Sequence, residues 1–304
     1  VAENKVEYEN DVNAASGQDR SLHFYVPESG CPDAKQAQVL MVLRDDSDTA
    51  SAEALMRELK LDELSEEEHF ILLFPDPQEG GWNYDCDPGR DNDMDFLNRC
   101  FGILRSSRIG VGGFNGMIFY IGASPSGSAM MLTMSALKPA NVSAMMLSEL
   151  PEAYELPKEA LGVETAAWCR EGKAAEYLRK ANGISEGVTE ADCPEGVIIY
   201  PGSNPECRLC ISELPLSAES VGTAWDKLFS RTRRWQNDTY GHYQYRTRFT
   251  ERGFTAHVAD TSLGVNDGFA HTWFEYVPPK LRGTKERVPL LFYFHGVNCV
   301  PLYG

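Results

Sequence analysis

A continuous apolar run at Met117–Ile121 constrains the fold of this chain more than any other segment. It leads into a short turn of glycine, serine and proline, and a segment rich in methionine and small residues follows. A strand that is apolar on both faces is typical of the centre of a parallel sheet, because helices cover both of its faces. The segment therefore predicts a strand, a tight turn and a helix inside an α/β fold.

Strand-like and helix-like segments alternate over most of the chain. We expect strands at residues 22–26, 39–43, 70–74, 116–121, 197–200 and 243–249, and helices at residues 50–61, 94–105, 126–135, 173–182 and 218–235. Such alternation predicts a mostly parallel central sheet with helices on both faces. The expected architecture is an α/β three-layer sandwich.

The beginning of the chain is repeated near its end. Tyr25-Val26-Pro27 recurs as Tyr276-Val277-Pro278, at an offset of 251 residues. The same offset, without a gap, matches Gly17 with Gly268, residues 21–25 with 272–276, and residues 39–43 with 290–294. Any two strand-rich segments share alternating apolar residues, but chance similarity would not keep one register. We therefore expect one domain at residues 1–252 and the first strands of a second copy at residues 253–304.

The repeated apolar segment at residues 290–294 has a further implication. A long apolar strand with an unpaired edge promotes aggregation unless another strand covers it. We therefore expect the remainder of the second domain to be a partner of this segment.

The turn after Met117–Ile121 contains the candidate nucleophile. A G-x-S-x-G elbow places a serine on a sharp turn between a strand and a helix. Here Gly122 and Ser124 fit that pattern, but Ser126 replaces the second glycine and Gly127 follows one position later. The alternative is that Ser124 serves only as the N-cap of the following helix.

The order of the segments resembles the polyhydroxybutyrate depolymerase and feruloyl-esterase-like branch of the α/β hydrolases. The matching residues are Phe24–Pro27, Phe74–Asp76, Gly81–Tyr84 and Tyr120–Ser124. The resemblance implies an α/β-hydrolase fold that cleaves carboxylic esters through an acyl-serine, without a cofactor or a metal ion. Aromatic residues such as Trp82, Tyr84 and Trp168 could stack on an aromatic or polyester acyl group, although aromatic residues more often belong to the core.

The first copy departs from this family at the oxyanion hole. The family has His-Gly after the strand that ends at Leu43, and this chain has Arg44-Asp45-Asp46 there. A carboxylate repels a developing oxyanion, and loss of one donor typically costs about 2.7 to 4 kcal/mol. The second copy has His295-Gly296 at the matching position. We therefore expect the competent oxyanion hole in the second copy.

The other two members of a triad are also altered in the first copy. Asn204 stands where the resemblance places the acid, after the strand at residues 197–200, and no histidine occurs at residues 250–255. The candidate bases are His242, His257 and His271, although a histidine at such a position is more often a surface or strand residue than a general base. A serine without its base is a weak nucleophile.

These departures leave three functions open. The chain is expected to be a carboxylic-ester hydrolase with its competent site in the second copy. The first copy could instead be a non-catalytic pseudo-hydrolase that acts as a scaffold or binding module. A weak esterase that pairs Ser124 with an unrecognised base is the third alternative.

Composition narrows the classes of partner. With 45 acidic and 28 basic residues the net charge is −17, which disfavours nucleic acid and anionic membranes as partners. The chain has no run of about 18 apolar residues, which is the length that a membrane-spanning helix needs.

The eight cysteines are dispersed and predict no compact disulfide framework. The lone Cys207-x-x-Cys210 gives only a minor alternative of a metal or redox site. The location stays open, with secretion favoured; the glycosylation sequons at Asn141 and Asn237 have meaning only in that case.

Overall fold

The structure is a computed structural model of the 304-residue chain. It describes residues 2–6, 20–28, 37–105, 113–184, 193–235, 239–243, 253–259 and 271–292.

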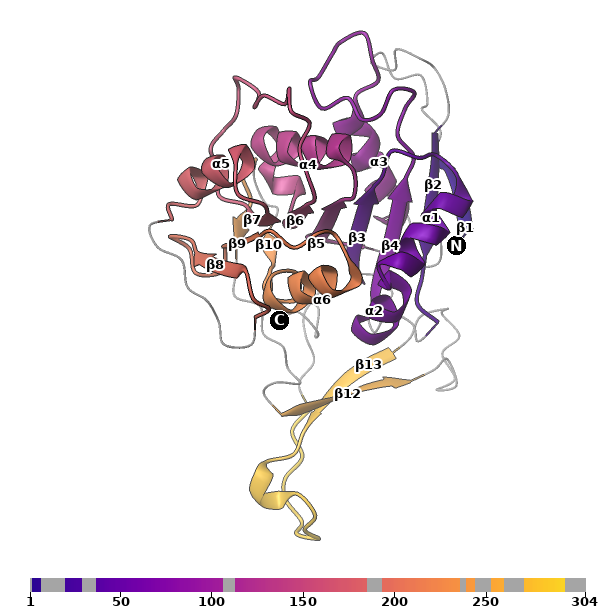
Figure 1. Ribbon diagram of the computed structural model, residues 1–304. Coiled ribbons are helices and arrows are strands. Elements are labelled where there is room, and N and C mark those ends of the chain that lie inside the picture. Colours follow the sequence, from indigo (N-terminus) through magenta and orange to yellow (C-terminus); the bar gives the residue numbers. More distant parts are fainter. Residues whose placement is uncertain are drawn as a thin grey trace.

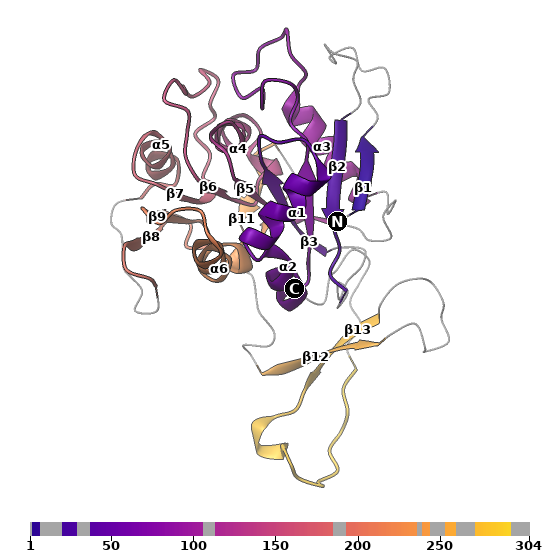
Figure 2. The ribbon, with the colours of Figure 1, turned by 45° about the vertical axis from the view of Figure 1, so that its right-hand side comes forward.

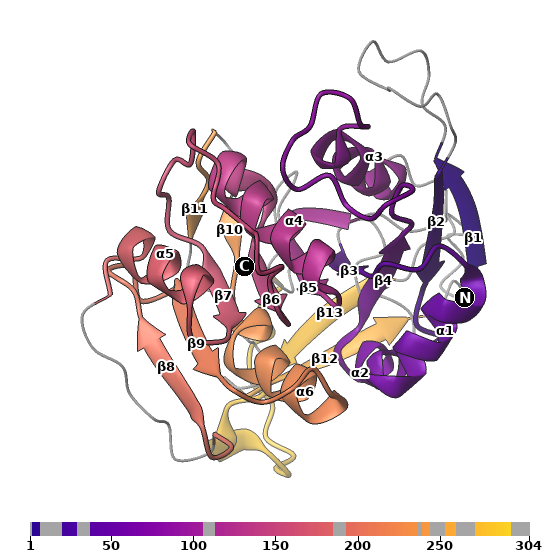
Figure 3. The same cartoon turned by 45° about the horizontal axis from the view of Figure 1, so that its top comes forward.

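A nine-stranded sheet forms the centre of the molecule (Figure 1). Its strands are β1 (Ala2–Val6), β2 (Arg20–Tyr25), β3 (Ala37–Leu43), β4 (Phe70–Pro75), β5 (Gly113–Gly122), β6 (Ala144–Leu147), β7 (Ala166–Cys169), β8 (Val197–Pro201) and β9 (Arg208–Ser212). They lie in the order β1-β2-β4-β3-β5-β6-β7-β9-β8, and Figure 3 shows β1 and β8 at opposite edges. The strands from β4 to β9 in this order are parallel, while β2 and β8 run against their neighbours. The expected mostly parallel sheet is therefore confirmed.

Among the described residues, six α-helices cover the two faces of this sheet. They are α1 (Thr49–Glu58), α2 (Leu61–Glu68), α3 (Asp93–Arg105), α4 (Pro125–Leu137), α5 (Lys173–Ala181) and α6 (Ala218–Lys227). Short 3₁₀ turns follow at Pro139–Asn141, Phe229–Arg231 and Pro279–Leu281. Buried residues of α3, α4 and α5 share one core cluster, and those of α1, α2 and α6 share the other. This arrangement is the expected three-layer sandwich.

The alternation of side chains along β3 explains how one strand serves both layers. Val39, Met41 and Leu43 belong to the cluster with α3, α4 and α5, whereas Leu40 and Val42 belong to the cluster with α1, α2 and α6. Successive side chains of a strand point to opposite faces. Because helices cover both faces, all seven residues of β3 are buried.

Side chains cap the first turns of α1 and α6. Asp48 caps α1 by accepting the backbone N–H of Ser51. Ser217 and Ser220 cap α6 reciprocally, each side chain accepting the backbone N–H of the other. Such caps stabilise a helix by about 1 kcal/mol. They fix where the chain leaves each loop and enters the helical layer.

Two small antiparallel sheets lie outside the main one. The first pairs β10 (Arg234–Trp235) with β11 (His242–Tyr243), and the second pairs β12 (Phe254–Ala259) with β13 (His271–Tyr276). Figure 2 shows β12 and β13 apart from the nine-stranded sheet. Of the strand expected at residues 243–249, residues 244–249 lie outside the described part of the chain.

β12 and β13 pair in the same antiparallel manner as β1 and β2. β13 begins and ends 251 residues after β2. Val6 pairs with Arg20 in the first pair and Ala259 pairs with His271 in the second, which is a shift of two residues relative to this offset. A shift of two residues keeps the same faces of the strands together. Leu290, Leu291 and Phe292 are 77%, 88% and 71% exposed, whereas their counterparts at residues 39–41 are fully buried.

Candidate functional site

The carboxyl ends of the parallel strands meet at one edge of the sheet, where open α/β sheets bind their ligands. The residues that follow these ends are Asp45 after β3, Asp76 after β4, Ser124 after β5, Glu149 after β6, Glu171 after β7 and Glu213 after β9. Five of these six are acidic. The edge therefore carries one candidate nucleophile and these five carboxylates.

Ser124 is the N-cap of α4. Its backbone is extended, with φ −131° and ψ 163°, and its Oγ accepts the backbone N–H of Gly127 at 3.1 Å. Its side chain is mostly buried, with 9% of the residue exposed. The serine of a nucleophile elbow sits on a strained turn with its Oγ exposed. The geometry of Ser124 corresponds to the capping role.

Two glycines retain the close packing of an elbow. A Cβ at Gly122 would lie 2.5 Å from Cα of Ser128, and a Cβ at Gly127 would lie 2.5 Å from the carbonyl oxygen of Leu43. Both contacts involve backbone atoms, which cannot move away cheaply. Glycine is therefore required at both positions, which brings α4 close to β5 and to the end of β3.

Asp45 holds the hydroxyl groups of this turn. Ser124 Oγ and Ser126 Oγ both donate to Asp45 Oδ1, at 2.7 Å and 2.6 Å. Ser126 Oγ in turn accepts the backbone N–H of Trp82 at 3.3 Å. A carboxylate is only an acceptor when ionised, and it cannot stabilise an oxyanion. The position where the family has donors is thus filled by an acceptor.

Arg44 forms a buried ion pair at the carboxyl end of β4. Its Nη2 lies 2.7 Å from Asp76 Oδ1, and its Nη1 donates to the carbonyl of Pro75 at 3.2 Å. Its own carbonyl oxygen accepts the indole N–H of Trp82 at 2.9 Å. These contacts join the ends of β3 and β4 to the following loop. Arg44 therefore has a structural role.

In an α/β hydrolase the catalytic aspartate or glutamate comes after the nucleophile in the chain, and the catalytic histidine comes after that acid. Glu171 comes after β7 and forms a two-point ion pair with Arg179, at 2.5 Å and 2.7 Å. This hydrogen bond with Arg179 lowers the pKa of the Glu171 carboxyl. Glu213 comes after β9, and its Oε1 accepts the backbone N–H of Glu171 at 3.4 Å. No histidine occurs between His69 and His242, so neither strand end carries an imidazole.

Sequence reasoning missed Glu171 and Glu213 because β7 and β9 are short. β7 lies between β6 and β9 in the sheet and runs parallel to both, and this pairing shows that Glu171 and Glu213 follow the carboxyl ends of parallel strands. An ion pair between Arg170 and Glu149, with an Nη1–Oε1 distance of 2.8 Å, spans the ends of β6 and β7. Arg170 also donates to the carbonyl of Glu213 at 3.3 Å. Ion pairs and hydrogen bonds thus engage the charged residues that follow β6, β7 and β9.

Asn204 lies at the opposite edge of the sheet from Ser124. It sits in the turn between β8 and β9, and β8 is antiparallel to β9. The turn therefore precedes a parallel strand instead of following one. Asn204 Nδ2 donates to Glu164 Oε1 at 3.2 Å, and its Oδ1 accepts the backbone N–H of Glu206 at 3.1 Å. The structure does not bring Asn204 and Ser124 together.

The candidate histidines belong to the small sheets. His242 is an exposed residue of β11, and His257 in β12 lies 3.0 Å from Glu275 Oε2. His271 is the first residue of β13. His295 and Gly296 lie outside the described residues. The described contacts of Ser124 are with Asp45 and Gly127, and an imidazole is not among them.

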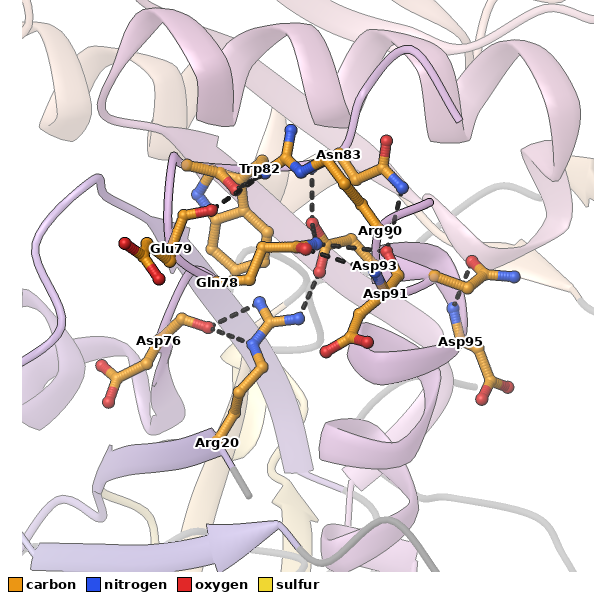
Figure 4. Close-up of polar contacts among 12 residues, drawn as sticks. Arg20, Asp76, Gln78, Glu79, Trp82, Asn83, Arg90, Asp91, Asp93 and Asp95 are labelled. Carbon is orange, nitrogen blue, oxygen red and sulfur yellow. Dashed lines mark hydrogen bonds and ion pairs between the residues drawn. The ribbon is translucent and has the colours of Figure 1, made fainter. Parts of the chain in front are cut away.

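A buried polar network anchors the loop between β4 and α3 (Figure 4). Asp93 forms an ion pair with Arg20 and accepts the backbone N–H of Asn83 at 2.6 Å and the amide of Gln78 at 2.9 Å. The Arg20 guanidinium also lies 3.7 Å from the ring centroid of Phe96. A desolvated cation–π contact of this kind is favourable. The network fixes the loop beside the carboxyl edge.

The aromatic and cysteine candidates are mainly core residues. Trp82 and Trp168 are fully or almost fully buried, so neither presents a platform for a ligand. Tyr84 is half-buried and packs against Tyr154. Cys207 and Cys210 are buried, and burial raises the pKa of the Cys207 thiol well above its ordinary value. Within the part of the chain that the structure describes, no cluster of histidine, cysteine and acidic residues could hold a metal ion.

No helix among the described residues is long and apolar enough to cross a membrane. Comparison of the sequence with protein-family models gives no match. Comparison with curated proteins gives none either.

Several solved structures of similar shape are described as esterases. The acetyl xylan esterase from Aspergillus awamori has a TM-score of 0.51 and 12% identity, over 76% of this chain and 99% of the other. A mutant of the feruloyl esterase module from Clostridium thermocellum, complexed with sinapinate, has a TM-score of 0.44 and 11% identity over 80% and 92%. A ferulic acid esterase has a TM-score of 0.43 and 13% identity over 59% and 84%. At such low identity the likeness to the acetyl xylan esterase extends to the fold, and together with the strand order it gives this chain an α/β-hydrolase-like fold.

Proposed function

We propose that this chain belongs to a tandem carboxylic-ester hydrolase whose first unit, residues 1–252, has lost acyl-serine chemistry at Ser124. The competent site belongs to a second unit that begins near residue 253. In that unit His295-Gly296 opens the oxyanion hole, and the reaction is acyl transfer to water through an acyl-serine. The remainder of the second unit is the partner of the β12–β13 pair.

The bond between Ser124 Oγ and Asp45 Oδ1 carries the proposal for the first unit. An active serine needs an imidazole to take its proton and donors to receive the oxyanion. Ser124 has a carboxylate as its acceptor, and that carboxylate stands where the donors belong. Glu171 and Glu213 after β7 and β9 are tied to arginine side chains or to backbone groups. The carboxyl edge of the first unit is therefore built for ion pairing.

The repeated strand pair supports the second unit. β13 matches β2 at the offset of 251 residues, and both strands pair with an antiparallel strand that precedes them in the chain. Leu290–Phe292 match three residues of β3, which lies between β4 and β5 in the first unit. Their exposure is what a strand of this kind shows before its neighbours are in place.

The substrate class follows from the fold and the family resemblance. The structural neighbours include esterases named for acetyl xylan and ferulic acid. We extend to this chain only the shared chemistry, a carboxylic ester, with an aromatic or polyester acyl group as the narrower alternative. Acyl-serine chemistry needs neither a cofactor nor a metal ion.

A pseudo-hydrolase is the second candidate for the first unit. The ion pairs of Arg170 and Arg179 at its carboxyl edge favour this alternative, because they take up groups that a catalytic acid and base would need free. In that case the first unit is a scaffold or binding module. Both proposals hold together if each unit has its own role.

Hydrolysis of p-nitrophenyl acetate by the 304-residue chain and its Ser124→Ala variant tests the loss of chemistry at Ser124. The two rates are expected to agree, with Ser126→Ala as the matched control. A fall of about tenfold or more in the Ser124→Ala variant alone would overturn the proposal. The intact mass of the native polypeptide tests the second unit. A mass well above that of 304 residues is expected, and a mass equal to it would contradict the tandem arrangement.

A further inference from the structure

Thr49, His23 and Asp76 form a hydrogen-bonded chain of a hydroxyl, an imidazole and a carboxylate. Thr49 Oγ1 lies 3.2 Å from His23 Nδ1, and His23 Nε2 lies 3.1 Å and 3.2 Å from the two oxygens of Asp76. Thr49 begins α1, His23 belongs to β2 and Asp76 follows β4. We propose that Thr49 is a nucleophile, separate from Ser124, that takes an acyl group from a carboxylic ester. The proposal takes from the proposed function only this class of substrate.

The partners of the imidazole determine its tautomer. An ionised Asp76 only accepts hydrogen bonds, so the ring proton lies on Nε2 of His23. The lone pair on Nδ1 then faces the Thr49 hydroxyl and can accept its proton. This is the order of roles in a nucleophile, base and acid triad, with the two ring nitrogens exchanged. Ser124 lacks such an arrangement because its hydroxyl donates to a carboxylate.

Thr49 is more exposed to solvent than His23 and Asp76, the two residues that support its hydroxyl. His23 is 2% exposed and Asp76 is 6% exposed, whereas Thr49 is half-buried. Arg44 Nη2 lies 2.7 Å from Asp76 Oδ1, and Arg20 donates to the Asp76 backbone carbonyl, so the carboxylate is held in place. A substrate can therefore approach the hydroxyl while the base stays positioned behind it.

The covalent step is an ordinary acyl transfer. Thr49 Oγ1 attacks the ester carbonyl carbon, and its proton moves to His23 Nδ1. The new oxygen–carbon bond forms, the bond to the leaving alcohol breaks, and the proton passes from His23 to the departing oxygen. Water then attacks the acyl-threonine, His23 accepts a proton from that water, and Thr49 regains its hydroxyl as the acid is released.

The surrounding charges make this reaction slow. Asp45, Asp46 and Asp48 lie in the loop before Thr49, and carboxylates disfavour a nearby oxyanion. Arg44 shares Asp76 with His23, which weakens the support that Asp76 gives to a protonated imidazole. We therefore expect single acylation of Thr49 to be easier to observe than turnover.

The test is acetylation by p-nitrophenyl acetate, followed by an acid quench and peptide mapping by mass spectrometry. The acetyl group is expected on Thr49 in the 304-residue chain and in the Ser124→Ala variant. The Thr49→Val variant keeps the shape of the side chain but has no hydroxyl, so no acetyl group is expected at residue 49. Thr223→Val is the matched control, because Thr223 is a helical threonine whose hydroxyl donates to the Glu219 carbonyl, and it is expected to be labelled normally at Thr49.

Two more variants keep the result interpretable. Thr49→Ser retains a hydroxyl and is expected to retain labelling, which separates loss of the nucleophile from loss of the fold. His23→Gln is expected to slow labelling about tenfold or more, because the base is gone. An acetyl group on Ser124 would overturn the proposed loss of chemistry there, whatever is found at Thr49. Unlabelled Thr49 in a folded protein, or labelling that His23→Gln leaves unchanged, would overturn the role of Thr49 alone.

Discussion

The hydroxyl of Ser124 donates a hydrogen bond to Asp45 across 2.7 Å, which ties the turn after β5 to the loop after β3. Both segments belong to the carboxyl edge of the sheet, where a hydrolase of this fold brings a nucleophile and oxyanion donors together. In this chain both segments keep their positions, and a hydrogen bond to a carboxylate joins them.

Replacement of Ser124 by alanine removes the N-cap of α4. Loss of such a cap typically costs about 1 kcal/mol of unfolding free energy. We expect a loss of this size for Ser124→Ala in urea unfolding followed by circular dichroism. Ser126→Ala is the control, because Ser126 also donates to Asp45 but is not the N-cap residue. Equal losses in both variants would show that the bond to Asp45 matters more than the cap.

Gly127 and Gly102 form a matched pair of helical glycines. A Cβ at Gly127 would meet the Leu43 carbonyl oxygen at 2.5 Å, whereas a Cβ at Gly102 in α3 would meet nothing within 4 Å. Gly127→Ala is expected to destabilise the protein by about 1 to 3 kcal/mol through overpacking. Gly102→Ala is expected to stabilise it by about 0.5 to 1 kcal/mol. Thermal unfolding of both variants checks the opposite signs, and a stable Gly127→Ala would contradict the close approach of α4 to β3.

Asp93 is the acceptor that holds the loop between β4 and α3. Asp93→Asn removes the negative charge that pairs with the buried Arg20 guanidinium, and breaking a buried pair in this way typically costs about 3 to 5 kcal/mol. Asp95→Asn in the same helix breaks only a partly exposed pair with Arg99, which is worth about 0.3 to 0.5 kcal/mol. Denaturant unfolding of the two variants measures the contrast. A small loss for Asp93→Asn would mean that Arg20 finds another partner.

Much of the main sheet could be predicted from the sequence because its long strands are apolar on both faces. β3, β4 and β5 lie where their apolar runs indicate. β6 and β7 have only four residues each, which is too short for a periodicity to be recognised. The helix expected at residues 218–235 ends at Lys227, and a 3₁₀ turn follows at Phe229–Arg231.

The candidate site could be predicted only in part, because strand direction is not written in the apolar pattern. The strand, turn and helix pattern places Ser124 at the start of a helix, as the structure has it. The pattern alone does not decide between a nucleophile and an N-cap. Asn204 was assigned on the assumption that residues 197–200 form a parallel strand, whereas β8 is antiparallel to β9. Only the pairing of β7 with β9 shows that Glu171 and Glu213 follow the relevant strand ends.

The ion pair between Glu171 and Arg179 gives a prediction about pH. The hydrogen bond with Arg179 lowers the pKa of the Glu171 carboxyl in the folded state below its unfolded value of about 4.3. A carboxyl with a lowered pKa stabilises the fold above the unfolded value, and that contribution disappears as the pH falls through the folded value. Glu171 and Arg179 are both partly exposed, so solvent screening limits the pair to about 1 kcal/mol or less.

We therefore expect Glu171→Gln to be less stable than the unmodified chain at pH 7 and equally stable once the pH is well below 4. Urea unfolding at several pH values measures this difference. Glu63→Gln is the control, because the Lys60–Glu63 pair is 3.4 Å apart and largely exposed, and it should show almost no difference at either pH. A Glu171→Gln difference that persists in acid would mean that packing, such as the contact of Arg179 with the Tyr200 ring of β8, and not charge, accounts for the effect.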